Sequence, residues 1–353
     1  MAIVGACLVL ASCAQTGPPL PPSLELPRPP SDLRATRKGD KVTLTWTEPR
    51  LTTDRQGIRY LGPTRICRTA AAELTECGNP AGESPAPTER AQRSQQSKTQ
   101  TAIDMLPPAL EEQNPAGDIT YAVEVLNRDK RGSGLSNRVR VPAVPTLPPP
   151  QNLTAELTGA GVSLSWTGVE ETQAPGARHR YRIYRREEGS AKDVIAGEIP
   201  MESAGPLHYL DSSFEWEKNY HYRMTVVSIV NQPRGEVQVE GDDTPPLRVV
   251  AHDVFPPAVP TGLQAVASGE GQKTFVDLIW APVTNLDLAG YNVYRREPNG
   301  EITKLNSDLV KAPAYRDTMA VPGKAYLYSV SAIDVRGNES AKSEEASETL
   351  MSQ

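Results

Sequence analysis

Few residues in this chain have the types and the spacing that chemistry requires. Its four histidines include no His-x-x-x-His pair and its cysteines no Cys-x-x-Cys pair, so the common metal-binding patterns are missing. Adjacent carboxylates such as Glu170-Glu171 and Glu187-Glu188 point apart on an extended chain and do not flank one substrate bond. No nucleophile turn, phosphate loop or dinucleotide-binding glycine pattern is present. We therefore expect no catalytic residue, no metal site and no cofactor.

Three arginines alternate with other residues in the middle of the chain: Arg178, Arg180 and Arg182. Because alternate residues of a strand lie on the same face, their guanidinium groups would form a positive stripe on an outward face. The plainer interpretation is that this charge keeps an exposed strand soluble and free of edge-to-edge aggregation. The alternative is that the stripe attracts an acidic glycan or a partner protein.

The N-terminal residues 2–10 are apolar but much shorter than the roughly 20 residues that a membrane-spanning helix needs. Such a segment is typical of the apolar part of a signal peptide. The residues that follow, Leu10-Ala11-Ser12-Cys13, resemble the lipobox of bacterial lipoproteins. The resemblance implies that Cys13 is acylated and becomes the lipid-anchored N-terminus of the mature protein. Ala14 after the cysteine implies sorting to the outer membrane if the cell is Gram-negative.

Two further cysteines, Cys67 and Cys77, flank a segment that we expect to reverse direction between two strands. Disulfides persist in exported proteins, and closing so short a loop stabilises the fold by about 2–3 kcal/mol. We predict a Cys67–Cys77 disulfide, with two unpaired thiols as the alternative. A zinc site is disfavoured because no histidine or other cysteine lies nearby in sequence.

The composition limits both the partners and the kind of core. The chain has 37 Lys and Arg against 43 Asp and Glu, a net charge of −6, and so lacks the basic excess that nucleic-acid binding requires. Aromatic residues make up only 5%, and 33 prolines and 26 glycines are scattered along the chain. This composition is more typical of small all-β domains with many turns than of helical domains. We expect no nucleic-acid partner.

One pattern occurs three times along the chain. Its anchor is a segment that alternates apolar with mostly polar residues, as a half-buried strand does, and ends in tryptophan: Trp46, Trp166 and Trp280. A proline opens a short segment before each of these strands, and an Arg-containing strand follows it. The last matched element is a strand near whose start a tyrosine stands: Tyr121, Tyr220 and Tyr326. We predict that the tryptophans and tyrosines belong to three separate cores.

These elements, in the same order three times, resemble fibronectin type III domains. The resemblance covers nearly everything after Pro30 and implies an all-β fold of three tandem immunoglobulin-like β-sandwiches joined by Pro-rich linkers. It also implies that Tyr121, Tyr220 and Tyr326 form tyrosine corners, in which the hydroxyl bonds back to upstream backbone.

We divide the chain at the proline-rich segments, which favour extended polyproline II and so predict semi-rigid spacers between domains of nearly independent stability. The predicted parts are a signal peptide (1–13), a Pro-rich tether (14–30), a first domain (31–142) with a polar surface loop near 78–101, a linker (143–150), a second domain (151–244), a linker (245–259) and a third domain (260–350).

The sequence thus predicts a non-catalytic lipoprotein of the cell envelope that acts as an adhesion, scaffold or spacer array. It would be monomeric, contact the membrane through its lipid anchor alone, and bind an envelope or extracellular protein or a glycan. The alternative is an accessory binding module of an extracellular polysaccharide system, because similar domains space the catalytic units of secreted glycosidases.

Overall fold

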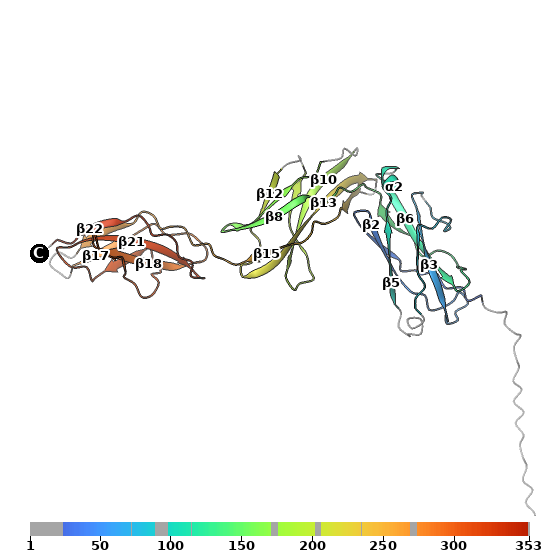
Figure 1. The fold of residues 1–353 in the computed structure, drawn as a ribbon, viewed down its shortest axis with the longest axis horizontal. Helices are drawn as coiled ribbons and strands as arrows, with labels where there is room; N and C mark the ends of the chain where they lie inside the picture. Colours follow the sequence, from blue (N-terminus) through green and yellow to red (C-terminus); the bar gives the residue numbers. More distant parts are fainter. Residues whose placement is uncertain are drawn as a thin grey trace, which may run out of the picture. The chain divides into compact units, whose positions relative to one another are not determined.

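The computed structural model describes residues 24–71, 73–88, 98–113, 115–170, 176–201, 206–233, 235–268 and 274–351. The predicted signal peptide, its candidate anchor Cys13 and most of the predicted tether lie outside these residues. Over the described residues the chain is built almost entirely of antiparallel strands, which form six sheets (Figure 1). The predicted all-β fold of β-sandwiches is confirmed.

The first sandwich contains a three-stranded sheet in the order β1-β2-β5 and a four-stranded sheet in the order β4-β3-β6-β7. The strands are β1 (Arg34–Lys38), β2 (Lys41–Thr47), β3 (Leu61–Thr69), β4 (Gly82–Ser84), β5 (Thr99–Met105), β6 (Asp118–Asn127) and β7 (Val139–Pro142), and a short helix α2 (Pro108–Gln113) joins β5 to β6. The loop predicted near 78–101 is less extensive than expected, because β4 and the start of β5 lie within it.

The second sandwich contains a three-stranded sheet in the order β12-β9-β8 and a five-stranded sheet. In the larger sheet β13 is long enough to pair with β15 along its first part and with β14 along its last part, and β10 and β11 complete the sheet. The strands are β8 (Gln151–Thr158), β9 (Gly161–Thr167), β10 (Ala177–Glu187), β11 (Val194–Pro200), β12 (Pro206–Asp211), β13 (Lys218–Gln232), β14 (Gly235–Glu240) and β15 (Leu247–Ala251).

The third sandwich repeats this plan with sheets in the orders β16-β17-β20 and β19-β18-β21-β22. The strands are β16 (Gln264–Ser268), β17 (Phe275–Ile279), β18 (Leu288–Arg296), β19 (Thr303–Lys304), β20 (Ala314–Asp317), β21 (Ala325–Asp334) and β22 (Ala346–Thr349).

The tryptophans lie in the interior, because alternate residues of their strands face the opposite sheet. In β2, Val42, Leu44 and Trp46 are all buried, and the strand residues between them are not. The three indoles are only 2%, 3% and 5% exposed at positions 46, 166 and 280. Trp166 and Trp280 each pack edge-to-face on a tyrosine of the facing sheet, at 5.5 and 5.1 Å between ring centroids.

By contacts between backbone positions, the described residues divide into two compact units. The first comprises those within 1–148, 171–180 and 226–242, and the second those within 149–170, 181–225 and 243–353. The first unit therefore contains the first sandwich together with β14 and the adjoining end of β13.

Candidate functional site

The predicted positive stripe lies on β10, where its arginines face carboxylates. Arg178 Nη2 lies 2.8 Å from Glu236 Oε2, and Arg180 Nη2 lies 3.9 Å from the other oxygen of that carboxylate. Arg182 Nε donates to Glu198 Oε1 at 2.6 Å. Because each guanidinium group has an acidic neighbour, little net charge is left to attract an anion. This geometry favours the plainer interpretation, in which the charges keep an exposed surface soluble.

The predicted disulfide between Cys67 and Cys77 is confirmed. The two Cα atoms lie 5.3 Å apart, within the range that a disulfide can span. Cys67 is buried on β3 and packs with Leu74 and Ala122. The bridge therefore fixes the segment after β3 against the edge of the first core, a structural role.

The predicted tyrosine corner forms in the second and third sandwiches. The Tyr220 hydroxyl lies 3.1 Å from the backbone nitrogen and 3.2 Å from the carbonyl oxygen of Glu215. The Tyr326 hydroxyl accepts a hydrogen bond from the backbone N–H of Val321 at 3.2 Å. Both tyrosines thus bond to backbone that precedes them, as a tyrosine corner does.

Tyr121 does not form a tyrosine corner, which corrects the role predicted for it. Its hydroxyl donates to Asp104 Oδ2 at 2.7 Å, and Arg68 Nη1 donates to the same oxygen at 2.6 Å. Asn127 and Asp334 cap the turns that follow β6 and β21 with the same hydrogen bonds, so these residues are equivalent. Counting back from them aligns Tyr121 with Tyr328 rather than with Tyr326. Tyr121 is nevertheless fully buried in the core.

Each sandwich contains the same buried Arg-Asp-Tyr triad. The three triads are Arg68-Asp104-Tyr121, Arg185-Asp211-Tyr222 and Arg295-Asp317-Tyr328, in which guanidinium and hydroxyl donate to one aspartate oxygen at distances from 2.6 to 3.0 Å. In the second and third sandwiches the guanidinium carbon also lies 5.3 and 4.7 Å from the ring centroid of the corner tyrosine. The first sandwich has Ile119 at the corner position and lacks this contact.

The triads hold the fold together rather than a substrate. Burial, together with the neighbouring aspartate, raises the pKa of the tyrosine hydroxyls of Tyr121, Tyr222 and Tyr328 above the usual range. For Asp211, burial acts to raise the pKa, but hydrogen bonds from Ser213 and Tyr222 and the charge of Arg185 outweigh it and keep the pKa low. The carboxylate therefore stays charged inside the sandwich because its partners surround it.

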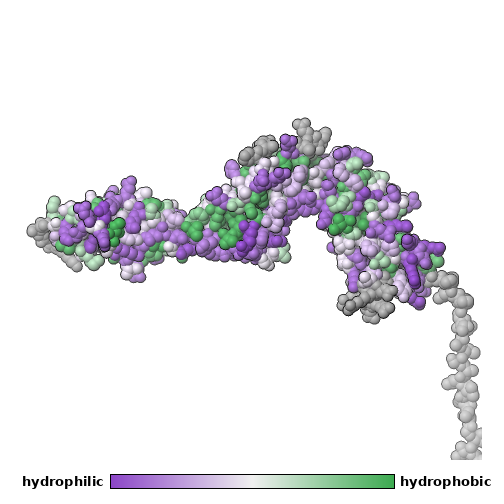
Figure 2. All heavy atoms as spheres, viewed as in Figure 1, coloured by the Kyte–Doolittle hydropathy of each residue, from purple (hydrophilic) through white to green (hydrophobic). Residues whose placement is uncertain are grey.

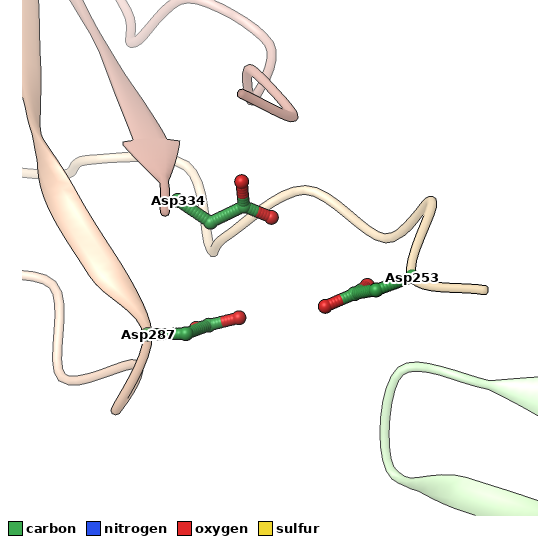
Figure 3. A group of neighbouring side chains, drawn as sticks. All are labelled: Asp253, Asp287 and Asp334. Atoms are coloured by element: carbon green, nitrogen blue, oxygen red, sulfur yellow. The ribbon is translucent and has the colours of Figure 1, made fainter. Parts of the chain in front are cut away.

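Three aspartates form the one group among the described residues whose geometry could hold a metal ion: Asp253, Asp287 and Asp334. Figure 3 shows their carboxylates pointing toward a common space from three different segments. One oxygen of each lies within 4.8 Å of the others, and carboxylate oxygens are the ligands that Ca²⁺ and Mg²⁺ take. The sequence predicted no metal site, and no spacing could reveal this group, because its members are far apart along the chain.

Existing contacts already account for two of these three carboxylates. Arg336 Nη1 lies 3.2 Å from Asp253 Oδ2, and the other oxygen of Asp253 accepts from the backbone N–H of Phe255 at 3.1 Å. Asp334 Oδ1 accepts from the backbone N–H groups of Arg336 and Asn338 at 2.8 and 2.9 Å. The cluster therefore attaches the second linker to the turn after β21, and we assign it no ion.

An open hollow of about 610 Å³ lies on the third sandwich, lined by Arg295 to Glu301, Thr303 and Tyr326. Its cations are held by carboxylates, since Arg295 Nη1 lies 2.7 Å from Asp317 and Arg296 binds both oxygens of Glu345 at 2.7 and 2.6 Å. Small-molecule sites of this volume are mostly apolar, whereas this lining is mainly polar. We assign it no ligand.

None of the helices in the described ranges combines the length and the apolar character that crossing a bilayer demands.

The chain is similar to short segments of larger curated proteins, and no family model matches it. It is 35% identical over 91 residues to an amylopullulanase of Thermoanaerobacterium saccharolyticum, which is 26% of this chain and 7% of that protein. It is 40% identical over 85 residues to an amylopullulanase of Thermoanaerobacter thermohydrosulfuricus, or 24% and 5%. It is 27% identical over 210 residues to exoglucanase B of Cellulomonas fimi, or 57% and 16%. The chain thus spans a small part of the length of these relatives.

Two solved structures are similar to the chain. The FN1–FN3 domains of chicken CNTN1 share 15% identity, with 92% of this chain and 100% of that chain covered and a TM-score of 0.26. An Fn3-like protein from Clostridium thermocellum shares 31% identity, with 28% of this chain and 98% of that chain covered and a TM-score of 0.24. Both are structures of fibronectin type III-like domains.

Proposed function

We propose, from the premise that the chain is a fibronectin type III-like all-β protein, that it is a non-catalytic accessory protein of a carbohydrate-processing system. In this role its sandwiches would space or present a carbohydrate-acting enzyme or its glycan. The observation that carries the proposal is the similarity to segments of two amylopullulanases and an exoglucanase, proteins named for action on pullulan and glucan. This is the alternative that the sequence left open, and the comparisons favour it.

The chemistry of the described residues supports a passive role. In each of the three triads the buried aspartate binds its own arginine and tyrosine, so the triads offer no free acid or base to a substrate. The arginines of the stripe on β10 are likewise paired with carboxylates.

The proposal is tested by looking for activity and for partners. The purified full chain is expected to release no reducing sugar from pullulan or from soluble β-glucan. Crosslinking in the producing cells, followed by mass spectrometry, is expected to capture a carbohydrate-acting enzyme or an attached glycan. Hydrolysis of either polymer by the pure chain, or crosslinks only to envelope proteins that have no link to carbohydrate, would overturn the proposal.

A second candidate is the scaffold or adhesion lipoprotein of the cell envelope. The observation that favours it is the lipobox-like segment Leu10 to Cys13. We propose that Cys13 carries the lipid, that the mature protein is a monomer, and that it is held at the outer membrane of a Gram-negative cell. Two or three acyl chains would anchor it firmly, since a single chain binds membranes only weakly.

Mass spectrometry of the mature N-terminus tests this anchor. The expected product begins at an acylated Cys13, and a Cys13→Ser variant is expected to be released from the membrane fraction. An unmodified Cys13 in the mature protein would contradict the proposal. An anchored protein that crosslinks to a carbohydrate-acting enzyme would combine the two candidates.

A further inference from the structure

The fourth tryptophan of the chain, Trp216, lies outside the three tryptophan positions that fill the sandwich cores. It stands in the connection between β12 and β13 and is partly exposed. Its ring packs edge-to-face on Phe214, with 4.8 Å between centroids, and lies 6.0 Å from the ring of Phe255. Phe255 comes from the chain after β15, so three aromatic side chains from two segments gather at this end of the second sandwich.

The backbone brings these two segments together in a defined way. In the β13–β15 ladder Lys218 lies opposite Ala251, and the N–H of Glu217 donates to the carbonyl of Ala251 at 2.6 Å. Glu217 itself has a φ of 63°, in the left-handed region that costs a residue with a side chain about 1–2 kcal/mol. The hydrogen bond to Ala251 therefore holds the turn after Trp216 in one conformation, although that conformation is unfavourable for Glu217.

The third sandwich shows that the fold does not require aromatic residues here. Its connection between β20 and β21 runs from Asp317 to Lys324, as the connection in the second sandwich runs from Asp211 to Lys218. In both connections a backbone N–H donates a hydrogen bond to the hydroxyl of the corner tyrosine. The positions that correspond to Phe214 and Trp216 are occupied in the third sandwich by two smaller residues, Ala320 and Pro322. The second repeat thus differs from the third in having an aromatic pair in this connection.

The surroundings of the aromatic rings are apolar and acidic. Val250 and Val254 are more than half exposed, and Figure 2 shows a hydrophobic area over the end of the second sandwich near β15. Glu215 and Glu217 are also exposed, and the basic groups beside them are paired. Lys218 Nζ lies 3.0 Å from Glu215, and Arg336 Nε lies 3.3 Å and His252 Nδ1 2.7 Å from Glu217. No positive charge is in excess here for an anionic ligand.

We propose that Phe214, Trp216 and Phe255, which we call the aromatic cluster, are a stacking site for a neutral glucan chain. A glucose ring has a face of C–H groups that packs on an aromatic ring, while its hydroxyl groups at the edge donate hydrogen bonds to carboxylates. The aromatic cluster supplies the rings, and the exposed carboxylate of Glu215 supplies an acceptor. The acidic rim disfavours nucleic acid and acidic glycans. The choice of a glucan rests on the proposed function.

Affinity electrophoresis of the full chain tests this site, with pullulan and barley β-glucan in the gel as two separate probes. One of them is expected to retard the wild-type protein, and Trp216→Ala is expected to weaken the interaction by roughly tenfold, which corresponds to about 1.4 kcal/mol. Met319→Ala is the matched control, because Met319 is exposed in the corresponding connection of the third sandwich. It is expected to leave the retardation unchanged.

A second variant keeps the test informative if Trp216→Ala does not fold. Trp216→Phe keeps an aromatic ring, and is expected to retain binding while losing the change in tryptophan emission that the polysaccharide causes in the wild type. Wild-type mobility unaffected by both polymers, or a folded Trp216→Ala protein that binds like the wild type, would overturn the site. Neither result would contradict the accessory role, because crosslinking to an enzyme partner tests that role independently.

Discussion

The two proline-rich linkers have similar compositions but opposite environments. In the first linker Val144 is 0% exposed and Leu147 is 5% exposed, whereas in the second linker Val254 is 58% exposed and Val259 is 41% exposed. Both were predicted to be semi-rigid polyproline spacers. The first instead contributes Val144 to a buried cluster, and the first part of the second, Leu247–Ala251, is strand β15 of the second sandwich, so that only the residues after Asp253 are mostly exposed. The difference shows that proline content alone does not decide whether a linker is a spacer, because the apolar residues between the prolines are buried only where another segment packs on them.

The first linker is buried because it packs on the end of the β13–β14 hairpin. Val144 forms a cluster with Val230 and Val239, and backbone bonds extend the contact, since the N–H of Gly39 donates to the carbonyl of Glu240 at 2.7 Å. All of these residues belong to the first compact unit. We therefore expect this contact to couple the stability of the first sandwich to that of the β13–β14 hairpin, whereas the sequence predicts nearly independent domains.

The second linker is attached by polar contacts. Asp253 binds the guanidinium of Arg336, and its backbone carbonyl accepts from Asn338 Nδ2 at 3.1 Å. Asp253 is buried, but the apolar side chains of Val254 and Val259 that follow it are exposed, so a substitution at either position removes little packing. We therefore expect substitutions in the first linker to matter more than substitutions in the second.

The largest expected difference between the two linkers comes from placing a charge in the first linker. Val144→Asp would bury an unpaired carboxylate in an apolar cluster and is expected to lower the free energy of unfolding of the first unit by more than about 3 kcal/mol. Val254→Asp in the second linker should change the free energy of unfolding of the second unit, to which Val254 belongs, by less than about 0.5 kcal/mol, as exposed substitutions do. Guanidinium denaturation measures both. Equal effects of the two substitutions would refute the contrast.

A titrating group beside the first linker makes its stability depend on pH. Arg37 donates to the carbonyl of Pro142 and to Glu111, at 2.5 Å, and the side chains of Arg37 and Glu111 are only 2% and 6% exposed. Burial raises the pKa of Glu111 to about 7, and the attraction of Arg37 only partly opposes this. Between pH 4.5 and about 7, Glu111 therefore keeps its proton in the folded protein, whereas it has lost this proton in the unfolded chain.

The raised pKa of Glu111 stabilises the folded state. This stabilisation is fully present below the pKa of Glu111 in the unfolded chain, 4.5, and is lost as pH rises through about 7. We expect the wild type to be more stable at pH 5 than at pH 8, relative to Glu111→Gln, by on the order of 2 kcal/mol. Urea melts of both proteins at the two pH values measure this difference. Parallel pH profiles for wild type and variant would show that Glu111 titrates normally.

Gly241 tests how closely the chain approaches the first linker. A Cβ atom at this position would lie 2.5 Å from the carbonyl oxygen of Leu147, so Gly241→Ala must displace backbone. We expect a loss of about 1–2 kcal/mol, visible as a lower melting temperature. Gly57→Ala is the matched control because nothing lies within 4 Å of the added methyl group. A neutral Gly241→Ala would mean that the linker can move aside.

The smallest expected effect concerns the ion pair that borders the first linker. Lys38 Nζ lies 3.1 Å from Glu240 Oε2, and both side chains are partly exposed. Lys38→Met is expected to cost less than about 1 kcal/mol, as partly exposed pairs do, and this cost is expected to shrink with added salt, which screens the pair. Thermal melts at low and high ionic strength measure it. A loss as large as that of Val144→Asp would show that charge, not apolar burial, holds this contact.

The parts of the fold that local patterns encode were predictable from sequence. Alternation placed Val42, Leu44 and Trp46 on the buried face of β2, and three copies of that strand indicated three sandwiches. The disulfide also followed from local information, because Cys67 and Cys77 flank one reversal of the chain. In these cases the physical cause acts between near neighbours in sequence or within one strand.

Features that depend on distant partners were missed. Tyr121 was assigned to the corner because the first repeat has one tyrosine where the other repeats have two, and only Asp104 reveals its position. The carboxylates that face the arginines of β10 were not predicted, because Glu198 and Glu236 come from other strands. Trp216 received no role, although it lacks the apolar alternation that precedes the other tryptophans. That irregularity was the available signal.

The burial of the first linker has a consequence for limited digestion. A protease needs several consecutive residues in an extended, accessible form, and the segment from Val254 to Val259 offers exposed side chains, whereas Val144 and Leu147 are enclosed. Cleavage should therefore release the third sandwich early and leave the first two as one resistant fragment.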